Sequence, residues 1–160
     1  MSFSIFLSKQ ECTQRFGVNS NNYPLTQGHE GVDLVPKNRV DWGVHIPAGF
    51  KNGIVVLDIE AKHPGRIYGC QVKVLFPANK VILQFCHLSE NTVDIGQIVT
   101  EGNLIGIMGN TGNSFGAHVH FNTIPTKDSS IKGYPRWAKI TEKYKDPEFI
   151  MEDPFYWTRH

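Results

Sequence analysis

Short apolar runs rich in β-branched residues alternate with glycine, asparagine and proline along most of the chain. Two such runs, "CQVKVLF" (70–76) and "KVILQFCHL" (80–88), flank the turn-forming residues "PAN" and predict a β-hairpin. The run "IVVLDIEA" (54–61) predicts another strand, and residues 92–124 repeat the apolar pattern with Gly and Asn between the runs. The pattern therefore favours a mainly β fold with a compact antiparallel sheet.

The composition changes after Ile124, where lysine and aromatic residues become frequent. Trp137, Ile140 and Tyr144 fall on one face of a helix, so this tail predicts one or two short helices. We expect its aromatic residues to pack on the sheet and close the domain; the alternative is that they bind glycan or cell wall. A chain of 160 residues, of which 40% are hydrophobic, suits a single packed domain over residues 1–160.

Charge and hydropathy exclude two classes of partner. With 16 basic and 15 acidic residues the net charge is +1, so no basic surface for nucleic acid is predicted. No stretch approaches the ~18–20 apolar residues that cross a bilayer, so no membrane insertion is expected. The start "MSFSIFLSKQ" lacks the basic segment and the sustained apolar stretch of a signal peptide. We therefore expect a protein that is cytoplasmic as synthesised unless another agent releases or carries it.

The cysteines do not predict disulfides. Cys12, Cys70 and Cys86 are odd in number and form no CxxC pair. We expect all three to be small core residues.

The segment "GAHVHF" (116–121) contains two histidines two residues apart between hydrophobic neighbours. Side chains alternate along a strand, so His118 and His120 are expected on one face, with the apolar residues on the other. Paired surface histidines without a function are common on half-exposed strands, and this remains the alternative. Whether the pair is functional therefore depends on which other residues of the chain could converge on it.

A second group of donors lies upstream in "GHEGVD". His29 and Asp33 are four residues apart, and Gly31 between them favours an extended turn over a helix. Catalytic zinc takes three protein ligands and a water, and two histidines with an aspartate form an acceptable set. His29, Asp33 and one histidine of the pair would supply it. The other histidine of the pair is then not needed as a zinc ligand, and neither is His87 in "QFCHLS".

Two spare imidazoles beside a metal suit one kind of chemistry. The metal lowers the pKa of its water, and a neutral histidine can take that proton or bind the oxyanion formed on an amide carbonyl. The residues alone thus indicate metal-assisted amide hydrolysis.

Four strings resemble the successive motifs of one family: "TQRFGVN", "GHEGVDLVP", "QFCHLS" and "VDIGQIVTEGNLIGIMGNTGNSFGAHVHF". In this order they are similar to the lysostaphin/LytM-type zinc metallopeptidases, the duplicated-hybrid-motif peptidoglycan endopeptidases. The resemblance extends over most of residues 13–122. It implies an antiparallel β-sheet or sandwich of the LytM type, whose sheet forms the floor of a groove for an extended peptide. The motif-bearing core would cover about residues 13–124.

The resemblance also implies roles for five residues. His29, Asp33 and His120 would bind Zn²⁺, and His87 and His118 would be catalytic, polarising the zinc water and stabilising the tetrahedral intermediate. The substrate would be the peptide stems or cross-bridges of peptidoglycan.

The sequence departs from the family pattern in three places. About residues 37–57 are expected to form an inserted loop, in which His45 is expected to be an exposed or locally bonded residue rather than part of the groove. Cys86 replaces a small residue; strand alternation places it facing away from His87, which favours packing over metal binding. The tail, residues 125–160, does not align with the family.

We therefore expect a zinc metalloendopeptidase that degrades cell wall, a phage lysin or a virion-associated hydrolase in view of the missing export signal. Two alternatives stay open. One is a catalytically silent LytM-like scaffold, activator or virion structural protein, against which the five intact site positions count. The other is a metallopeptidase or tail component that acts on a protein substrate.

Overall fold

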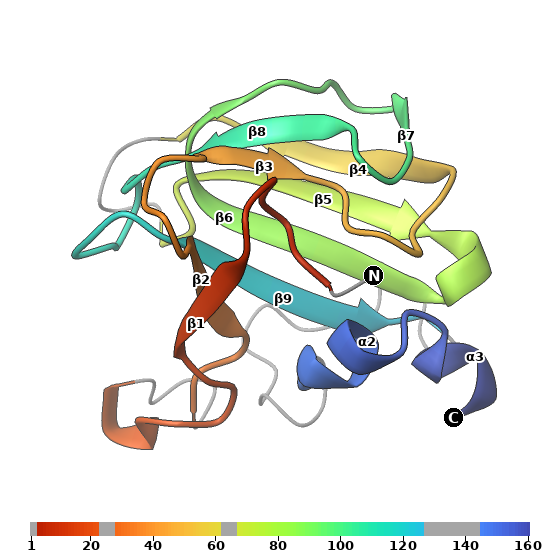
Figure 1. The fold of residues 1–160 in the computed structure, drawn as a ribbon, viewed down its shortest axis with the longest axis horizontal. Helices are drawn as coiled ribbons and strands as arrows, with labels where there is room; N and C mark the ends of the chain where they lie inside the picture. Colours follow the sequence, from red (N-terminus) through yellow and green to blue (C-terminus); the bar gives the residue numbers. More distant parts are fainter. Residues whose placement is uncertain (1–2, 23–27, 62–66, 127–144) are drawn as a thin grey trace.

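The computed structural model describes residues 3–22, 28–61, 67–126 and 145–160, which form one antiparallel sheet with two short helices at the C-terminal end (Figure 1). The strands run in the order β1-β2-β9-β6-β5-β4-β7, and β8 pairs with both β6 and β3. Every pairing is antiparallel, which confirms the predicted mainly β, antiparallel class. The strands are β1 (Gln10–Gln14), β2 (Val32–Pro36), β3 (Gly43–His45), β4 (Gly53–Ile59), β5 (Cys70–Phe76), β6 (Val81–Asn91), β7 (Ile98–Val99), β8 (Leu104–Met108) and β9 (Val119–Pro125).

The predicted hairpin consists of β5 and β6, joined by the short 3₁₀ helix η2 (Pro77–Asn79). Lys80 closes the turn in the left-handed conformation, with a φ of 52°. Alternate residues of β5 are buried, which is the pattern of a strand with one face on a core. Residues Val81 to Leu88 of β6 are buried without interruption, so β6 is the central strand of the sheet.

The two faces of the central strands differ in chemistry. One face is apolar and forms the core, because β-branched and aromatic residues recur at every second position. The opposite face of β9 and β6 carries polar side chains, among them Asn122, whose amide donates to Gln84 across the two strands. The core residues from these strands and from β2 are Val32, Leu34, Cys70, Val72, Val74, Phe76, Val81, Leu83, Phe85, Val119 and Phe121.

The expectation of a loop over residues 37–57 is wrong. This segment contains β3, which pairs with β8, and the first part of β4, which pairs with β5 and β7 and confirms the strand predicted over 54–61. Val44, Ile46, Phe50 and Val55 are at most 2% exposed and belong to the core. Glycine and proline interrupt the apolar pattern here, yet burial of the large side chains between them still stabilises the fold.

The described part of the tail contains the predicted short helices, α2 (Glu148–Glu152) and α3 (Tyr156–Arg159). Ile150 and Trp157 are buried in the core cluster, and Phe149 stacks on Tyr156 with ring centroids 4.7 Å apart. In Figure 1 α2 lies near the end of β9, and α3 lies further along the chain, where it packs against α2 and η2. These aromatics therefore close the domain, as expected. The predicted helical face of Trp137, Ile140 and Tyr144 lies outside the described residues.

Cys70 and Cys86 are buried, as expected, but Cys12 is exposed on β1. Its prediction as a core residue is wrong, because β1 is the edge strand of the sheet and is exposed along its centre. Within the described ranges, no helix combines the length and apolar character needed to cross a bilayer.

Candidate metal centre and groove

Pairing between β2 and β9 brings the first two candidate ligands together. Asp33 and His120 are direct partners in this antiparallel register, so their side chains share one face of the sheet. The neighbouring residues Val32 and Leu34 are fully buried in the core on the other face. Alternation along β2 thus directs the Asp33 carboxylate to the polar face.

His29 approaches the pair from the segment that leads into β2. Gly31 permits this approach, because a Cβ at this position would overlap with the Asn122 side chain and the carbonyl oxygen of Phe121. The segment therefore lies directly against β9. His29 is 1% exposed, and its ring is held in place by a contact of 3.1 Å between Nδ1 and the carbonyl oxygen of Arg15.

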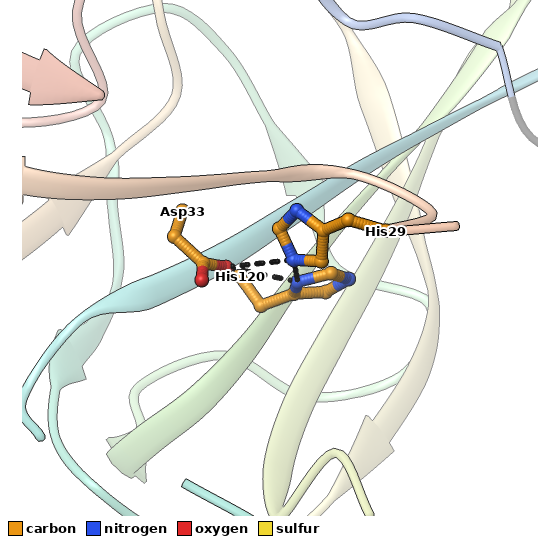
Figure 2. Close-up of side chains that lie close together, drawn as sticks. All are labelled: His29, Asp33 and His120. Carbon is orange, nitrogen blue, oxygen red and sulfur yellow. Dashed lines mark hydrogen bonds and ion pairs between the residues drawn. The ribbon is translucent and has the colours of Figure 1, made fainter. Parts of the chain in front are cut away.

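Figure 2 shows the side chains of His29, Asp33 and His120 pointing toward one another. His29 Nε2 lies 2.9 Å from His120 Nδ1 and 3.1 Å from Asp33 Oδ1, and the latter two atoms are 3.0 Å apart. In tetrahedral zinc sites, with zinc–ligand distances of ~2.0–2.1 Å, neighbouring donors are separated by about 3.3 Å. The two nitrogens and the oxygen therefore match, in type and spacing, three corners of a zinc tetrahedron.

The electrostatics of the buried cluster is dominated by its carboxylates. Burial alone would lower the pKa of His120, but hydrogen bonds and charge interactions with Asp33 and Glu30 raise it from 6.5 to about 9. Burial alone would likewise raise the pKa of Asp33, yet its bonds to His120 and His29 hold that pKa well below its usual range. A cluster that favours a cation on His120 offers the same negative field to a metal ion.

Two residues that the sequence analysis missed lie behind His120. Glu30 is 6% exposed, and its Oε1 is 3.4 Å from His120 Nε2. The Tyr68 hydroxyl donates to the same oxygen over 2.9 Å. Burial would raise the pKa of Glu30, but His120 and Tyr68 outweigh it and lower that pKa to about 2. The sequence did contain a signal for Glu30: this carboxylate directly follows the candidate ligand His29, in a segment that becomes apolar.

His87 reaches the site through a β-bulge. Between the paired positions Cys70–Leu88 and Val72–Phe85, β6 contains one residue more than β5, and His87 has a φ of 63°. This left-handed conformation is strained for a residue with a side chain. It is held by the His87 N–H, which donates to the Tyr68 carbonyl oxygen (2.8 Å), and by a 2.7 Å contact from ring Nδ1 to the Thr111 carbonyl oxygen. Burial, with the charge of His120, lowers the pKa of His87 to about 4, so its ring is neutral at pH 7.

His118 comes from the end of the loop between β8 and β9. Its Nδ1 is 2.7 Å from the carbonyl oxygen of Gly116, and its Nε2 is 3.6 Å from Asp33 Oδ1. The rings of His87 and His118 lie side by side, with centroids 4.9 Å apart. The five residues predicted from the sequence therefore converge on one place.

Cys86 lies next to the bulge and keeps the regular register with β9, whereas the bulge redirects His87. Cys86 is the direct partner of His120 across β6 and β9, so it faces the metal-site side of the sheet rather than away from His87. The predicted orientation is wrong because alternation breaks at the extra residue of a bulge. The Cys86 thiol is fully buried, and burial raises its pKa well above 9.0, which disfavours the thiolate needed for metal binding.

His45 lies on β3, where its Nδ1 is 3.0 Å from the carbonyl oxygen of Gly102. It does not line the groove that contains the site. The groove has a volume of about 780 Å³, with Thr13, Gln14 and Arg39 among its lining residues on and near β1 and β2, and Ile67, Asn113 and Phe115 among those from the loops before β5 and β9.

Comparison with known proteins identifies the class. The family described as Peptidase family M23 matches residues 27–132, and the chain belongs to this peptidase family. The predicted resemblance is thus confirmed.

Individual relatives agree with this assignment. The chain is 31% identical over 124 residues to the peptidoglycan DD-endopeptidase ShyA of Vibrio cholerae; the match covers 73% of this chain and 28% of that protein. The chain therefore spans little more than a quarter of that relative.

Two solved structures share the fold. The catalytic domain of the antimicrobial peptidase lysostaphin from Staphylococcus simulans matches with a TM-score of 0.60 and 22% identity, over 91% of this chain and 93% of that one. A zinc-containing peptidase from Vibrio cholerae matches with a TM-score of 0.56 and 21% identity, over 79% of this chain and 37% of that one.

Proposed function

We propose that the chain is a zinc-dependent endopeptidase that hydrolyses amide bonds in the peptide cross-links of bacterial peptidoglycan. The observation that carries this proposal is the triangle of two imidazole nitrogens and one carboxylate oxygen, with sides of 2.9–3.1 Å, beside two further histidines in a groove. Membership of a peptidase family and a peptidoglycan endopeptidase relative support it.

His29, Asp33 and His120 would hold the zinc. Their donor atoms fit its preferred ligands, and their low exposure keeps competing water away. Bound zinc would act as a Lewis acid that makes water nucleophilic near neutral pH. The fixed contact of His29 Nδ1 with the Arg15 carbonyl oxygen leaves Nε2 as the donor toward the site.

His87 and His118 would be the catalytic residues. Each ring has its Nδ1 against a backbone carbonyl oxygen, of Thr111 and Gly116 respectively, which requires a proton on Nδ1 and leaves Nε2 to act in the groove. A neutral Nε2 can accept a proton from the attacking water, and the protonated ring can stabilise the oxyanion or donate to the leaving amine.

The groove beside these residues suits an extended peptide. Apolar Phe115 is 99% exposed at one wall, and the Arg39 side chain, half-exposed, lies at another. A cationic and an apolar contact together match a stem peptide, which combines carboxylates with alanine side chains.

We expect delivery to the wall during phage lysis or in a virion, which is tested by mass-spectrometric detection of the chain in lysates and in purified particles.

The test of the function is mass spectrometry of cross-linked peptidoglycan after incubation with the zinc-loaded protein. Walls with direct and with bridged cross-links are compared, and His118→Ala serves as the matched blank. New peptide termini that form with the wild type alone support the proposal and identify the bond. No new termini in any wall, despite bound zinc, would favour the silent scaffold; cleavage of denatured protein instead would favour the protein-directed peptidase.

A further inference from the structure

We propose that Glu30, held by Tyr68, is a positioning residue that fixes the ring of His120 for metal binding. This inference rests on the proposed zinc function and adds two residues that the motif-based prediction did not include. Neither Glu30 nor Tyr68 contributes a donor atom to the triangle described above.

The two nitrogens of His120 have opposite surroundings. Nδ1 faces the other two donors of the metal triangle, at 2.9 and 3.0 Å. Nε2 is buried, and the charged oxygen beside it is Glu30 Oε1, at 3.4 Å. When Nδ1 binds a metal, Nε2 carries the ring proton and needs an acceptor in this dry environment. Glu30 is placed to be that acceptor.

Tyr68 holds this carboxylate in position by two contacts. Its hydroxyl donates to Glu30 Oε1, the oxygen that faces His120, over 2.9 Å. Its ring stacks on the His120 ring at an angle of 21°, with centroids 5.9 Å apart. These contacts restrict both the carboxylate and the imidazole, so little side-chain freedom is left to lose when a metal binds.

Tyr68 also connects the two halves of the site. Its backbone carbonyl oxygen accepts the N–H of His87 at the strained bulge. One residue thus supports the ring of a metal ligand with its side chain and the position of a catalytic histidine with its backbone. Tyr68→Phe keeps the backbone and the stacked ring and removes only the hydroxyl bond to Glu30.

The test is the zinc affinity of Glu30→Gln and Tyr68→Phe, measured by competition with a chromophoric chelator. Partners of metal-bound histidines typically contribute about 10- to 100-fold to metal affinity. We expect a loss in this range for Glu30→Gln and a smaller loss, about 3- to 10-fold, for Tyr68→Phe. Glu90→Gln, an exposed carboxylate on β6, is the matched control and should bind zinc like the wild type.

A spectroscopic readout separates positioning from a general structural role. In cobalt(II)-loaded protein the visible absorption bands report the ligand geometry, so Glu30→Gln should shift them and Glu90→Gln should not. If Glu30→Gln does not fold, Tyr68→Phe carries the test by itself.

Wild-type affinity and an unchanged cobalt spectrum in both Glu30→Gln and Tyr68→Phe would overturn the inference alone, provided that the wild type binds zinc and cleaves peptidoglycan. A wild type that binds no zinc would overturn the proposed function as well.

Discussion

Asp33 and His120 reach the site from regular antiparallel strands, whereas His87 and His118 reach it from a bulge and from the end of a loop. Two of the three candidate metal ligands are therefore placed by strand register and alternation, and His29 joins them from the segment before β2. The catalytic half depends on one left-handed residue and on backbone carbonyls of the loop between β8 and β9. In the proposed function, one sheet would hold the metal while a bulge and a loop end would present the reacting groups.

Removal of a metal ligand should give the largest effect. Asp33→Ala or His120→Ala leaves two of three protein donors, and we expect zinc affinity to fall on the order of 10³-fold, with loss of hydrolysis. Chelator competition and metal analysis of the purified variants measure this. Full zinc occupancy in either variant would contradict the assignment of the metal half.

The catalytic half should respond differently. His87→Ala and His118→Ala should keep zinc affinity within about threefold and lose about 10²- to 10⁴-fold in the rate of peptidoglycan hydrolysis, the usual contribution of a general acid or base. Rates of release of new peptide termini, measured on zinc-saturated protein, test this. Equal losses of zinc and activity would show that the two halves are not separable.

Thr111 tests the support of the catalytic half. Its hydroxyl donates to the Leu88 carbonyl oxygen (2.6 Å) and accepts the Cys70 N–H (3.0 Å), while its own carbonyl contacts His87. Thr111→Val should lower the free energy of unfolding by about 1–2 kcal/mol and slow hydrolysis, without loss of zinc. Urea unfolding measures the free energy of unfolding, zinc titration measures binding, and the release of new peptide termini measures the rate of hydrolysis. Thr92→Val, which removes an exposed hydroxyl bond to Leu104, is the control and should change neither.

The smallest effect concerns the pH dependence of the metal-free protein. The pKa of Glu30 is lowered to about 2, so its contribution to stability is present above 4.5 and is lost as the pH falls toward 2. The pKa of His120 is raised to about 9, so its contribution is present below 6.5 and is lost as the pH rises through 9. The Glu30–His120 pair should thus contribute most to the stability of the metal-free protein between about pH 4.5 and 6.5.

The difference in melting temperature between the wild type and Glu30→Gln, measured across pH without metal, tests this. The difference in melting temperature should become smaller as the pH falls from 4.5 toward 2 and as it rises from 6.5 through 9. A difference that is independent of pH would contradict the electrostatic account.

The sequence predicted the parts of this molecule that follow from regular periodicity. Alternation gave the hairpin of β5 and β6 and the shared face of His118 and His120. It failed for the orientation of Cys86 relative to His87, because the bulge redirects His87 to the side of Cys86 and leaves no clear mark in a single sequence. The loop expected over residues 37–57 came from the departure from the family pattern, and Gly and Pro in this segment concealed core residues such as Phe50.

Glu30 and Tyr68 show a different limit. They are 38 residues apart in the chain and meet only because the loop before β5 lies against the segment that leads into β2. Contacts of this kind depend on tertiary packing, and no local sequence pattern predicts them. His87, by contrast, was found because its motif marks it, although its strained backbone was not predicted.

The most direct test of the central claim is X-ray absorption spectroscopy of zinc bound to the wild-type protein. We predict a four-coordinate shell of nitrogen and oxygen at ~2.0–2.1 Å, with the outer scattering of two imidazoles and no sulfur. A sulfur scatterer at ~2.3 Å would identify Cys86, the partner of His120 across the sheet, as a ligand and would contradict the assignment of the metal to His29, Asp33 and His120.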